Sequence, residues 1–332
     1  MGIVGLGRMG RFHAAALAGV QEVDLVALVE PQADALDLAV QFAPAAARHQ
    51  SVAEGLAQPG LEAVLVAAST PTHPEIVAAA LDRGLHVLCE KPLALDVTVA
   101  HDLGTQATER GLVLQVGFWR RFAPPWRQAK ARIDSGEIGT PLYLRLAQWD
   151  ADPPPPEFCD PAVSGGLAID CGVHEFDLAE WLTGRRITQV SAWALPIVDQ
   201  GVGDAGDVDN LVAVLELDGG AVATVDLSRN ARYGDDVRTE VLGSNGALLV
   251  DLLPSSRTRL GSVRGMRELA ESSVDDAMAV GVADQARAFA RAVRGETVDI
   301  PGAQASVRAT QVGRAVIEAT GSGGRIAVVS GP

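Results

Sequence analysis

Lys91 and His174 are the side chains best suited by type and setting to acid–base chemistry. Lys91 directly follows an apolar run in Cys89-Glu90-Lys91-Pro92. Of the 27 basic residues only Lys91 and Lys130 are lysines, so arginine supplies positive charge elsewhere. A lysine ammonium is compact and its pKa shifts on burial, which arginine cannot reproduce. Pro92 can fix a sharp turn that holds this ammonium in one direction. Lys91 is therefore a candidate functional residue, whereas Lys130 lies in a polar helical run typical of a surface.

His174 lies in a second candidate segment, where it is the only side chain with an ordinary pKa near neutrality. General acid–base catalysis near pH 7 requires such a group. Asp170 lies one helical turn earlier and can stabilise the charged imidazole. Asp177 and Trp181 continue the same helical stripe, which is a poor core face, so we expect it to border a polar cavity. A metal site from Asp170, Cys171 and His174 is disfavoured, because no second cluster completes a ligand set.

A glycine-rich segment near the start of the chain is typical of a dinucleotide-binding loop. Gly5-Leu6-Gly7-Arg8-Met9-Gly10 follows an apolar run and opens a helical pattern. Gly5 would permit a tight turn, Gly7 would let the backbone approach a pyrophosphate, and Gly10 would allow close helix–strand packing. Glu30, at the end of the next apolar run, can accept hydrogen bonds from ribose hydroxyls and would repel a 2′-phosphate. This pattern predicts NAD rather than NADP; an incidental glycine turn is the alternative.

Ser69-Thr70-Pro71-Thr72-His73 follows another apolar run and is a further candidate for cofactor contact. Open α/β sheets bind ligands at the carboxyl ends of their strands, where this segment would lie. Thr70 and Pro71 could line the nicotinamide side of the cofactor. His73 has either a functional role or the ordinary role of a polar residue at a helix start.

The first third of the chain alternates short apolar runs with helix-period segments. The spacing predicts strands at Gly2–Leu6, Val23–Val29, Glu62–Ala68, His86–Cys89 and Leu112–Val116. It predicts helices at Met9–Ala18, Gln32–Phe42, Pro74–Arg83 and Val97–Arg110. Such alternation is typical of a parallel sheet with helices on both faces. The chemistry-bearing segments above would then follow four of these strands.

After Gly117 the pattern changes to strands separated by glycine-rich turns. Helices are predicted at 125–135 and 167–182, a strand at 142–148, and a stiff proline-rich loop at 152–157. An antiparallel meander is expected from Ile187–Ala194, Asn210–Leu217, Ala221–Leu227, Val237–Leu242 and Ala247–Asp251. Two helices, Val282–Arg294 and Ala303–Thr320, follow. We therefore expect a nucleotide-binding domain at 1–118 and a second domain at 119–332.

Composition excludes several classes of partner and location. The net charge of −15 repels a phosphate backbone, so nucleic acid is not an expected partner. No apolar stretch is long enough to cross a membrane, and no cleavable leader is evident, so we expect a cytoplasmic protein. The three cysteines, Cys89, Cys159 and Cys171, lack metal or disulfide spacing and fit reduced thiols.

Together these motifs resemble the glucose-fructose oxidoreductase/inositol dehydrogenase (Gfo/Idh/MocA) family over essentially the whole chain. The resemblance rests on the glycine loop, Glu30, Thr70-Pro71-x-His73, Glu90-Lys91-Pro92, Gly117–Phe122 and Gly165–Asp177. It implies an α/β protein with an N-terminal Rossmann doubly wound parallel sheet. It also implies a C-terminal α+β domain with a large, mostly antiparallel open sheet, through which relatives assemble as homodimers or homotetramers. Within the family the chain is most similar to myo-inositol 2-dehydrogenases.

The resemblance also implies residue roles. Lys91 would orient and polarise the reacting oxygen, His174 would be the acid/base, and Asp170 would support it. The substrate would contact Lys91 and a set of residues in the second domain: Trp119, Arg120, Asp150, Asp152, Asp170, Cys171, His174 and Asp177. The cofactor would contact Gly5, Gly7, Arg8, Met9, Gly10, Glu30, Ser69, Thr70, Pro71, His73, Glu90 and Lys91.

These expectations describe an NAD-dependent dehydrogenase that acts on a secondary hydroxyl of a cyclic polyol or sugar, such as myo-inositol. NAD carries out the redox chemistry while the protein supplies position and proton transfer. Three alternatives remain open on the same fold. They are a dehydrogenase or ketoreductase for another sugar derivative, a non-catalytic NAD-sensing regulator, and a lyase or glycosidase that oxidises its substrate transiently.

Overall fold

The computed structural model describes residues 1–151, 153–195, 197–252, 256–262, 264–272 and 274–329. The chain divides into two compact units. The first contains Met1–Phe122 and Ala279–Val307, and the second contains Ala123–Met278 and Arg308–Pro332. The expected domain boundary between residues 118 and 119 remains a prediction.

A six-stranded parallel sheet forms the centre of the first unit. Its order is β3-β2-β1-β4-β5-β6, and every neighbouring pair is parallel. The strands are β1 (Gly2–Val4), β2 (Ala27–Val29), β3 (Ala47–His49), β4 (Ala63–Val66), β5 (His86–Cys89) and β6 (Leu114–Val116). This is the doubly wound dinucleotide-binding order, whose switch point lies between β1 and β4. The predicted Rossmann sheet is confirmed, although the sequence pattern did not predict β3.

The strands β1, β2 and β4 are buried along their whole length, as expected where helices cover both faces of a sheet. The helices of this unit are α1 (Arg8–Leu17), α2 (Ala33–Ala39), α3 (Val52–Gly55), α4 (His73–Asp82) and α5 (Val97–Glu109), with short turns η1 (Val40–Phe42), η2 (Thr70–Thr72) and η3 (Trp119–Phe122). The side chain of Asp96 accepts hydrogen bonds from the N–H groups of Thr98 and Val99, so it caps and starts α5.

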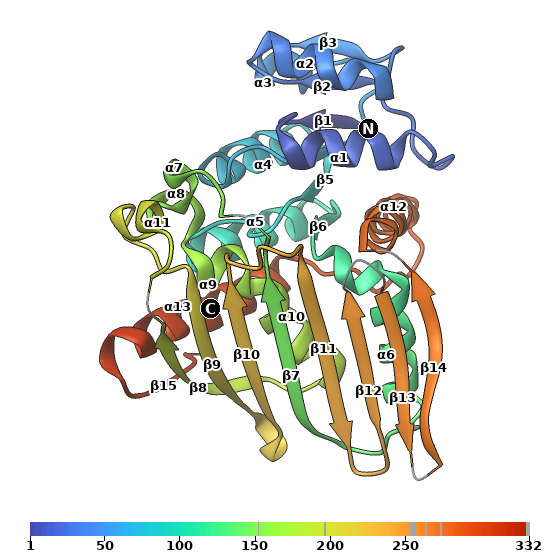
Figure 1. Ribbon diagram of the computed structural model, residues 1–332. Helices are drawn as coiled ribbons and strands as arrows, with labels where there is room; N and C mark the ends of the chain where they lie inside the picture. The colour runs from blue at the N-terminus through green and yellow to red at the C-terminus, as the bar shows by residue number, and fades with distance from the viewer. Residues whose placement is uncertain (152, 196, 253–255, 263, 273, 330–332) are drawn as a thin grey trace. The chain divides into compact units, whose positions relative to one another are not determined.

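A nine-stranded mixed sheet forms the second unit, in the order β14-β13-β12-β11-β7-β10-β9-β8-β15 (Figure 1). Its strands are β7 (Pro141–Trp149), β8 (Ile187–Ala194), β9 (Asn210–Leu217), β10 (Val222–Ser228), β11 (Asp236–Gly243), β12 (Ala247–Leu252), β13 (Ser256–Ser262), β14 (Gly265–Ser272) and β15 (Arg325–Ala327). Among the described strand pairs of this sheet, only β7–β10 is parallel. The predicted large, mostly antiparallel sheet is therefore confirmed, as a sheet in which β7 separates β10 from β11 rather than a simple meander.

Helices cover one face of this sheet. They include α6 (Pro124–Asp134), α9 (Leu167–Asp170) and α10 (Gly172–Thr183), with α6 and α10 drawn behind the strands in Figure 1. The shorter helices of this unit are α7 (Pro156–Cys159), α8 (Pro161–Ser164), α11 (Gln200–Asp204) and η4 (Asp218–Gly220). Trp126 of α6 is fully buried, and its Nε1 donates to Thr239 Oγ1 of β11 at 3.0 Å. Strand β9 alternates between buried and partly exposed residues, so the face of β9 that points away from the helices is partly exposed.

Two long helices, α12 (Val274–Val293) and α13 (Ala303–Ser322), each contribute residues to both units. The single helix predicted over 167–182 is in fact two helices, because the hydrogen-bonded pattern is interrupted at Cys171. Asp170 therefore ends α9, and His174 lies in the first turn of α10. The predicted helical face is therefore interrupted after Asp170, whereas His174, Asp177 and Trp181 lie together on α10.

Candidate functional site

The glycine loop joins the end of β1 to the start of α1, and two of its glycines are required by packing. Gly5 has a φ of +89°, and a Cβ there would lie 2.5 Å from the backbone nitrogen of Ala68. A Cβ at Gly10 would lie 1.9 Å from the carbonyl oxygen of Gly5. A Cβ at Gly7, by contrast, would meet no atom of the chain within 4 Å. The loop is thus tight against the sheet but open at Gly7, as backbone approach to a pyrophosphate requires.

Glu30 is tied to the same loop. Its carboxylate accepts the N–H of Leu6 at 2.8 Å and the N–H of Gln32 at 3.1 Å. The first turn of α1 begins at Gly7 without a side-chain cap, so its N–H groups and positive dipole end are available to an anion. Arg8 is exposed and Met9 half-buried in that turn. An open glycine, an uncapped helix start and a carboxylate at the end of β2 fit the diphosphate and ribose of NAD.

The predicted segment after β4 forms a short turn whose polar residues differ in exposure. Ser69 and Pro71 are exposed and Thr70 is half-buried, so all three are accessible to a ligand. His73 is 1% exposed. Its Nδ1 lies 2.9 Å from the Pro92 carbonyl oxygen and its Nε2 lies 3.0 Å from that of Ala68. Burial lowers the pKa of His73, so we interpret it as a positioning residue that links the two strand ends.

Glu90 lies at the end of β5 and forms a buried ion pair with His13 of α1. The His13 Nε2 and Glu90 Oε1 atoms are 2.6 Å apart, and the side chains are 1% and 8% exposed. Burial opposes ionisation of Glu90, but the hydrogen bond and charge of His13 and the charge of Lys91 outweigh it, so the pKa of Glu90 is lowered. Glu90 Oε2 also accepts the N–H of Lys91 at 3.2 Å. Glu90 thus connects the helix of the glycine loop to the backbone of Lys91.

Lys91 is half-buried and precedes a cis peptide bond to Pro92. Strand β6, which pairs with β5, ends at Val116, and a Cβ at the following Gly117 would lie 3.0 Å from the Glu90 carboxyl group. Trp119 and Arg120 follow in η3 and are 9% and 4% exposed. The Arg120 guanidinium lies 5.8 Å from the centre of the Trp119 ring.

In the second unit, Asp150 and Cys171 are brought together at the end of β7. The Cys171 thiol donates to Asp150 Oδ2 at 3.3 Å, and Gln148 Nε2 donates to Asp150 Oδ1 at 3.1 Å. Burial raises the pKa of Asp150. Asp152, also predicted to contact substrate, lies outside the described residues.

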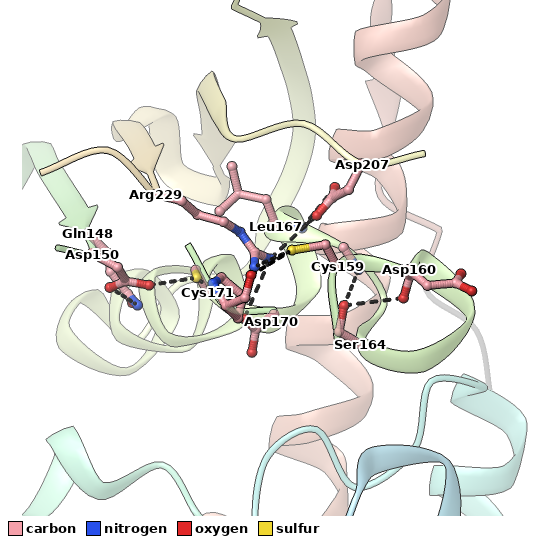
Figure 2. Close-up of polar contacts among 12 residues, drawn as sticks. Gln148, Asp150, Cys159, Asp160, Ser164, Leu167, Asp170, Cys171, Asp207 and Arg229 are labelled. Carbon is pink, nitrogen blue, oxygen red and sulfur yellow. Dashed lines mark hydrogen bonds and ion pairs between the residues drawn. The ribbon is translucent and has the colours of Figure 1, made fainter. Parts of the chain in front are cut away.

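A buried arginine that the sequence reading missed lies next to this pair (Figure 2). Arg229 follows β10 and is 0% exposed. Its Nη2 lies 3.6 Å from Asp170 Oδ2 and 3.4 Å from Asp207 Oδ2. Its Nη1 lies 3.4 Å from the Cys159 sulfur. A solitary Arg-Asn after an apolar strand gave no sequence signal, because its acidic partners are distant in the chain.

His174 and Asp177 lie on α10 and are 7% and 4% exposed. Trp181, the last member of the predicted stripe, lies under the Lys130 ammonium, with 6.0 Å from Nζ to the ring centre. Lys130 also pairs with Asp134, so it is a partly covered helix-surface charge. The predicted residues therefore form two groups: the cofactor loop, turn and Lys91 in the first unit, and the Asp150, Asp170 and His174 segments in the second.

In the described part of the chain, no group of three or more His, Cys, Asp or Glu side chains could hold a metal ion. Among the helices described, none combines the length and apolar character needed to span a bilayer.

Comparison with known proteins shows what the chain resembles. Residues 1–118 match the oxidoreductase family with an NAD-binding Rossmann fold, and residues 126–249 match the GFO/IDH/MocA C-terminal domain. A scyllo-inositol 2-dehydrogenase (NAD(+)) of Bacillus subtilis is 34% identical over 79% of this chain and 77% of its own length. The myo-inositol 2-dehydrogenase of Thermotoga maritima is 35% identical over 80% and 79%.

Solved structures of dehydrogenases have the same fold as this chain. A probable dehydrogenase from Thermotoga maritima superimposes with a TM-score of 0.89 at 30% identity and covers 98% of each chain. A scyllo-inositol dehydrogenase from Lactobacillus casei, determined with NAD(H) and scyllo-inositol, gives 0.85 at 26% identity over 99% of this chain and 98% of its own. The predicted NAD cofactor and oxidoreductase class are confirmed. The chain belongs to the Gfo/Idh/MocA family of NAD-binding oxidoreductases.

Proposed function

We propose that this chain oxidises a secondary hydroxyl of a cyclic polyol of the inositol class, with NAD as the oxidant. The observation that carries this proposal is the similarity, at 34% and 35% identity over about four fifths of the chain, to two inositol 2-dehydrogenases. The open glycine loop and the Glu30 carboxylate support NAD as the cofactor. Asp150, Asp170 and Asp177 supply carboxylates of the kind that hydrogen-bond to a ring bearing many hydroxyls.

Oxidation of a CH–OH group to a ketone removes one proton and one hydride. NAD, when bound, accepts the hydride. We assign the hydroxyl proton to His174, because imidazole has an ordinary pKa near neutrality, and the support of the resulting imidazolium to Asp170. We assign to the Lys91 ammonium the stabilisation of negative charge on the reacting oxygen. The His13–Glu90 pair supports this assignment because it fixes the backbone that carries Lys91.

The test is a panel of cyclic polyols and sugars, with myo-inositol and scyllo-inositol first, assayed with NAD by NADH absorbance. We expect net NADH formation with at least one inositol. Lys91→Met and His174→Asn should each lower kcat about 10²–10⁴-fold while NADH binding, followed by fluorescence, persists. Lys130→Met, at the only other lysine, and His101→Asn, on α5, are the matched controls and should retain wild-type turnover.

The outcomes separate the alternatives. Turnover of another sugar but of no cyclic polyol would replace the substrate class and keep the dehydrogenase. Substrate consumption without net NADH would indicate a lyase or glycosidase that returns the hydride. Tight NADH binding with no turnover of any compound would favour an NAD-sensing regulator.

We also propose that the chain forms a homodimer or homotetramer through the open face of its nine-stranded sheet. In-register residues on that face include Tyr143, opposite both Val222 and Leu242, and Trp193, opposite Val212. Leu242 and Trp193 are 49% and 52% exposed. Apolar surface of this kind is normally covered by a partner. Val214→Asp, placed on the same face of β9, should convert the oligomer to a monomer in light scattering; a wild-type monomer would contradict the proposal.

A cytoplasmic location is proposed on the state of the cysteines. All three are free thiols and buried in the structure. Reduced thiols are typical of cytosolic proteins.

A further inference from the structure

Arg229 is a buried cation that lies among acidic side chains of the second unit. Arg229 is fully buried, and its backbone N–H donates to the carbonyl of Asp209 at 2.8 Å, which fixes the chain at the end of β10. Its Nη2 lies within 3.6 Å of one Asp170 oxygen and within 3.4 Å of one Asp207 oxygen (Figure 2). One guanidinium therefore forms ion pairs with two carboxylates. A buried charge is tolerated only when paired in this way.

The second carboxylate also holds the helix that carries the first. Both oxygens of Asp207 accept the N–H of Leu167, at 2.9 and 3.1 Å, and Leu167 is the first residue of α9. Asp170 is the last residue of that helix. Gly166 makes this approach possible, since a Cβ there would lie 2.7 Å from Asp207 Oδ1. Arg229 and Asp207 thus constrain both ends of one helical turn.

The acidic groups around Asp170 in this unit need a cation to balance their charge. Asp150 and Asp207 both repel the Asp170 carboxylate electrostatically, and burial raises the pKa of each of these two carboxyl groups. The Cys171 thiol lies 3.7 Å from Asp170 Oδ2, and Cys159 is also electrostatically coupled to Asp170. His174 follows on α10. Arg229 is a positive group that contacts Asp170, and burial keeps water from screening its charge.

We propose that Arg229 is a positioning residue that holds Asp170 in place and ionised, so that Asp170 can support a charged His174. This inference rests on the role proposed above for Asp170. Arg229 is fully buried and is assigned no contact with substrate or cofactor. Its contribution to catalysis is therefore assigned to its contact with Asp170.

Charge-changing variants distinguish this role from a purely structural one. Arg229→Gln removes the cation and should raise the pKa of Asp170 by about 1–3 units, the usual effect of losing an opposite charge at this range. Asp207→Asn removes a competing negative charge and should lower it. Arg229→Lys keeps the charge but lacks the planar fork, so its shift should be smaller than that of Arg229→Gln.

The matched control is Arg308→Gln. Arg308 is also buried, at 7% exposure, and its Nη2 pairs with Glu180 of α10 at 2.8 Å. Loss of this pair removes a buried charge of the same type from the same unit but leaves the Asp170 cluster intact. It should lower stability without moving the titration of Asp170.

Two readouts are used on the full chain. The side-chain carboxyl carbon of Asp170 is titrated by NMR, with Asp170→Asn to assign it, and the pH dependence of kcat/KM is measured on a polyol that the wild type oxidises. Below the raised pKa of Asp170, kcat/KM of Arg229→Gln should fall relative to the wild type, because protonated Asp170 no longer supports an imidazolium. In Asp207→Asn no such fall is expected.

The result that would overturn the inference is a folded Arg229→Gln variant in which both readouts match the wild type, or an equal shift in Arg308→Gln. If Arg229→Gln does not fold, the opposite shifts of Arg229→Lys and Asp207→Asn decide the question. A chain that oxidises no polyol would contradict the proposed function, yet the NMR titration would still test whether Arg229 keeps Asp170 ionised.

Discussion

Replacing His13 with leucine should destabilise the first unit strongly. His13 and Glu90 are 1% and 8% exposed and 2.6 Å apart, so His13→Leu leaves a carboxylate buried without its partner. Removing one member of a buried pair costs about 3–5 kcal/mol. For a unit of this size, 1 kcal/mol corresponds to about 2–4 °C in the unfolding midpoint, so the midpoint should fall by about 6–20 °C.

Calorimetry at neutral pH measures this change, and two further variants calibrate it. Asp82→Asn breaks an ion pair with Arg110 in the same unit whose side chains are 59% and 42% exposed, so it should cost about 0–1 kcal/mol. The double variant His13→Leu/Glu90→Gln removes the buried charge but keeps an oxygen that can accept the Lys91 N–H. It should recover more than half of the stability lost in His13→Leu, because the desolvated charge is the main cost.

The stability lost in His13→Leu should also depend on pH, and it should become smaller as the pH falls. The pKa of Glu90 is lowered in the folded chain, so its pair stabilises the protein at neutral pH and the stabilisation is lost as acid protonates the carboxylate, below the ordinary Glu pKa of about 4.3. The midpoints of wild type and His13→Leu should therefore converge on acidification. A loss below about 1 kcal/mol at pH 7, or costs that simply add in the double variant, would refute this reasoning.

Three further predictions concern the cofactor loop and the polar cluster. Gly10→Ala should lower the unfolding midpoint, because its Cβ would lie 1.9 Å from the Gly5 oxygen. Gly7→Ala has open space around its Cβ, so it should change the free energy of unfolding by less than about 0.5 kcal/mol. It should nevertheless weaken NAD binding at least about tenfold in calorimetric titration. Glu30→Ser should raise the ratio of kcat/KM for NADP to that for NAD, because no carboxylate then repels the 2′-phosphate; an unchanged ratio would refute the role of Glu30. Asp150→Asn should leave the fold intact and raise KM for the polyol more than it lowers kcat, since its proposed role is binding; a selective fall in kcat would contradict that role.

The elements with strong local patterns were predicted from the sequence almost residue for residue. Ile187–Ala194 and Asn210–Leu217 are β8 and β9 at the predicted bounds, because apolar and polar residues alternate between clear turns. The missed strand β3, Ala47-Arg48-His49, has no apolar run and lies at the sheet edge. Strand β14, at one edge of the second sheet, is similarly polar, with one arginine and two glutamates in eight residues. Edge strands are held by one neighbour and need less apolar sequence, so periodicity does not detect them.

The break between α9 and α10 also had no sequence signal. Cys171 keeps right-handed helical φ and ψ values of −93° and −48°, so helical spacing continues across the interruption. Gly172 follows it, where a Cβ would lie 2.9 Å from the Phe176 ring. Close packing against a side chain, rather than a helix-breaking pattern, distinguishes this position.

Site residues were predictable where their chemistry is local in sequence. The glycine loop and Glu90-Lys91-Pro92 are contiguous motifs, and their residues were named from the sequence. His13 and Arg229 were not, because each acts through a partner far along the chain: His13 and Glu90 are 77 positions apart. The contacts of His13 with Glu90, and of Arg229 with Asp170 and Asp207, form only in the folded chain, so the sequence alone did not indicate them.

The proposed reaction transfers a hydride from a secondary carbinol carbon to NAD. The most direct test is to supply an inositol deuterated at its carbinol carbons, with unlabelled NAD, and to determine the isotopic content of the NADH and the ketone formed. We expect one deuterium in each NADH produced, one ketone for each NADH, and loss of both products in Lys91→Met and His174→Asn. NADH without deuterium, or undiminished products in either variant, would contradict it.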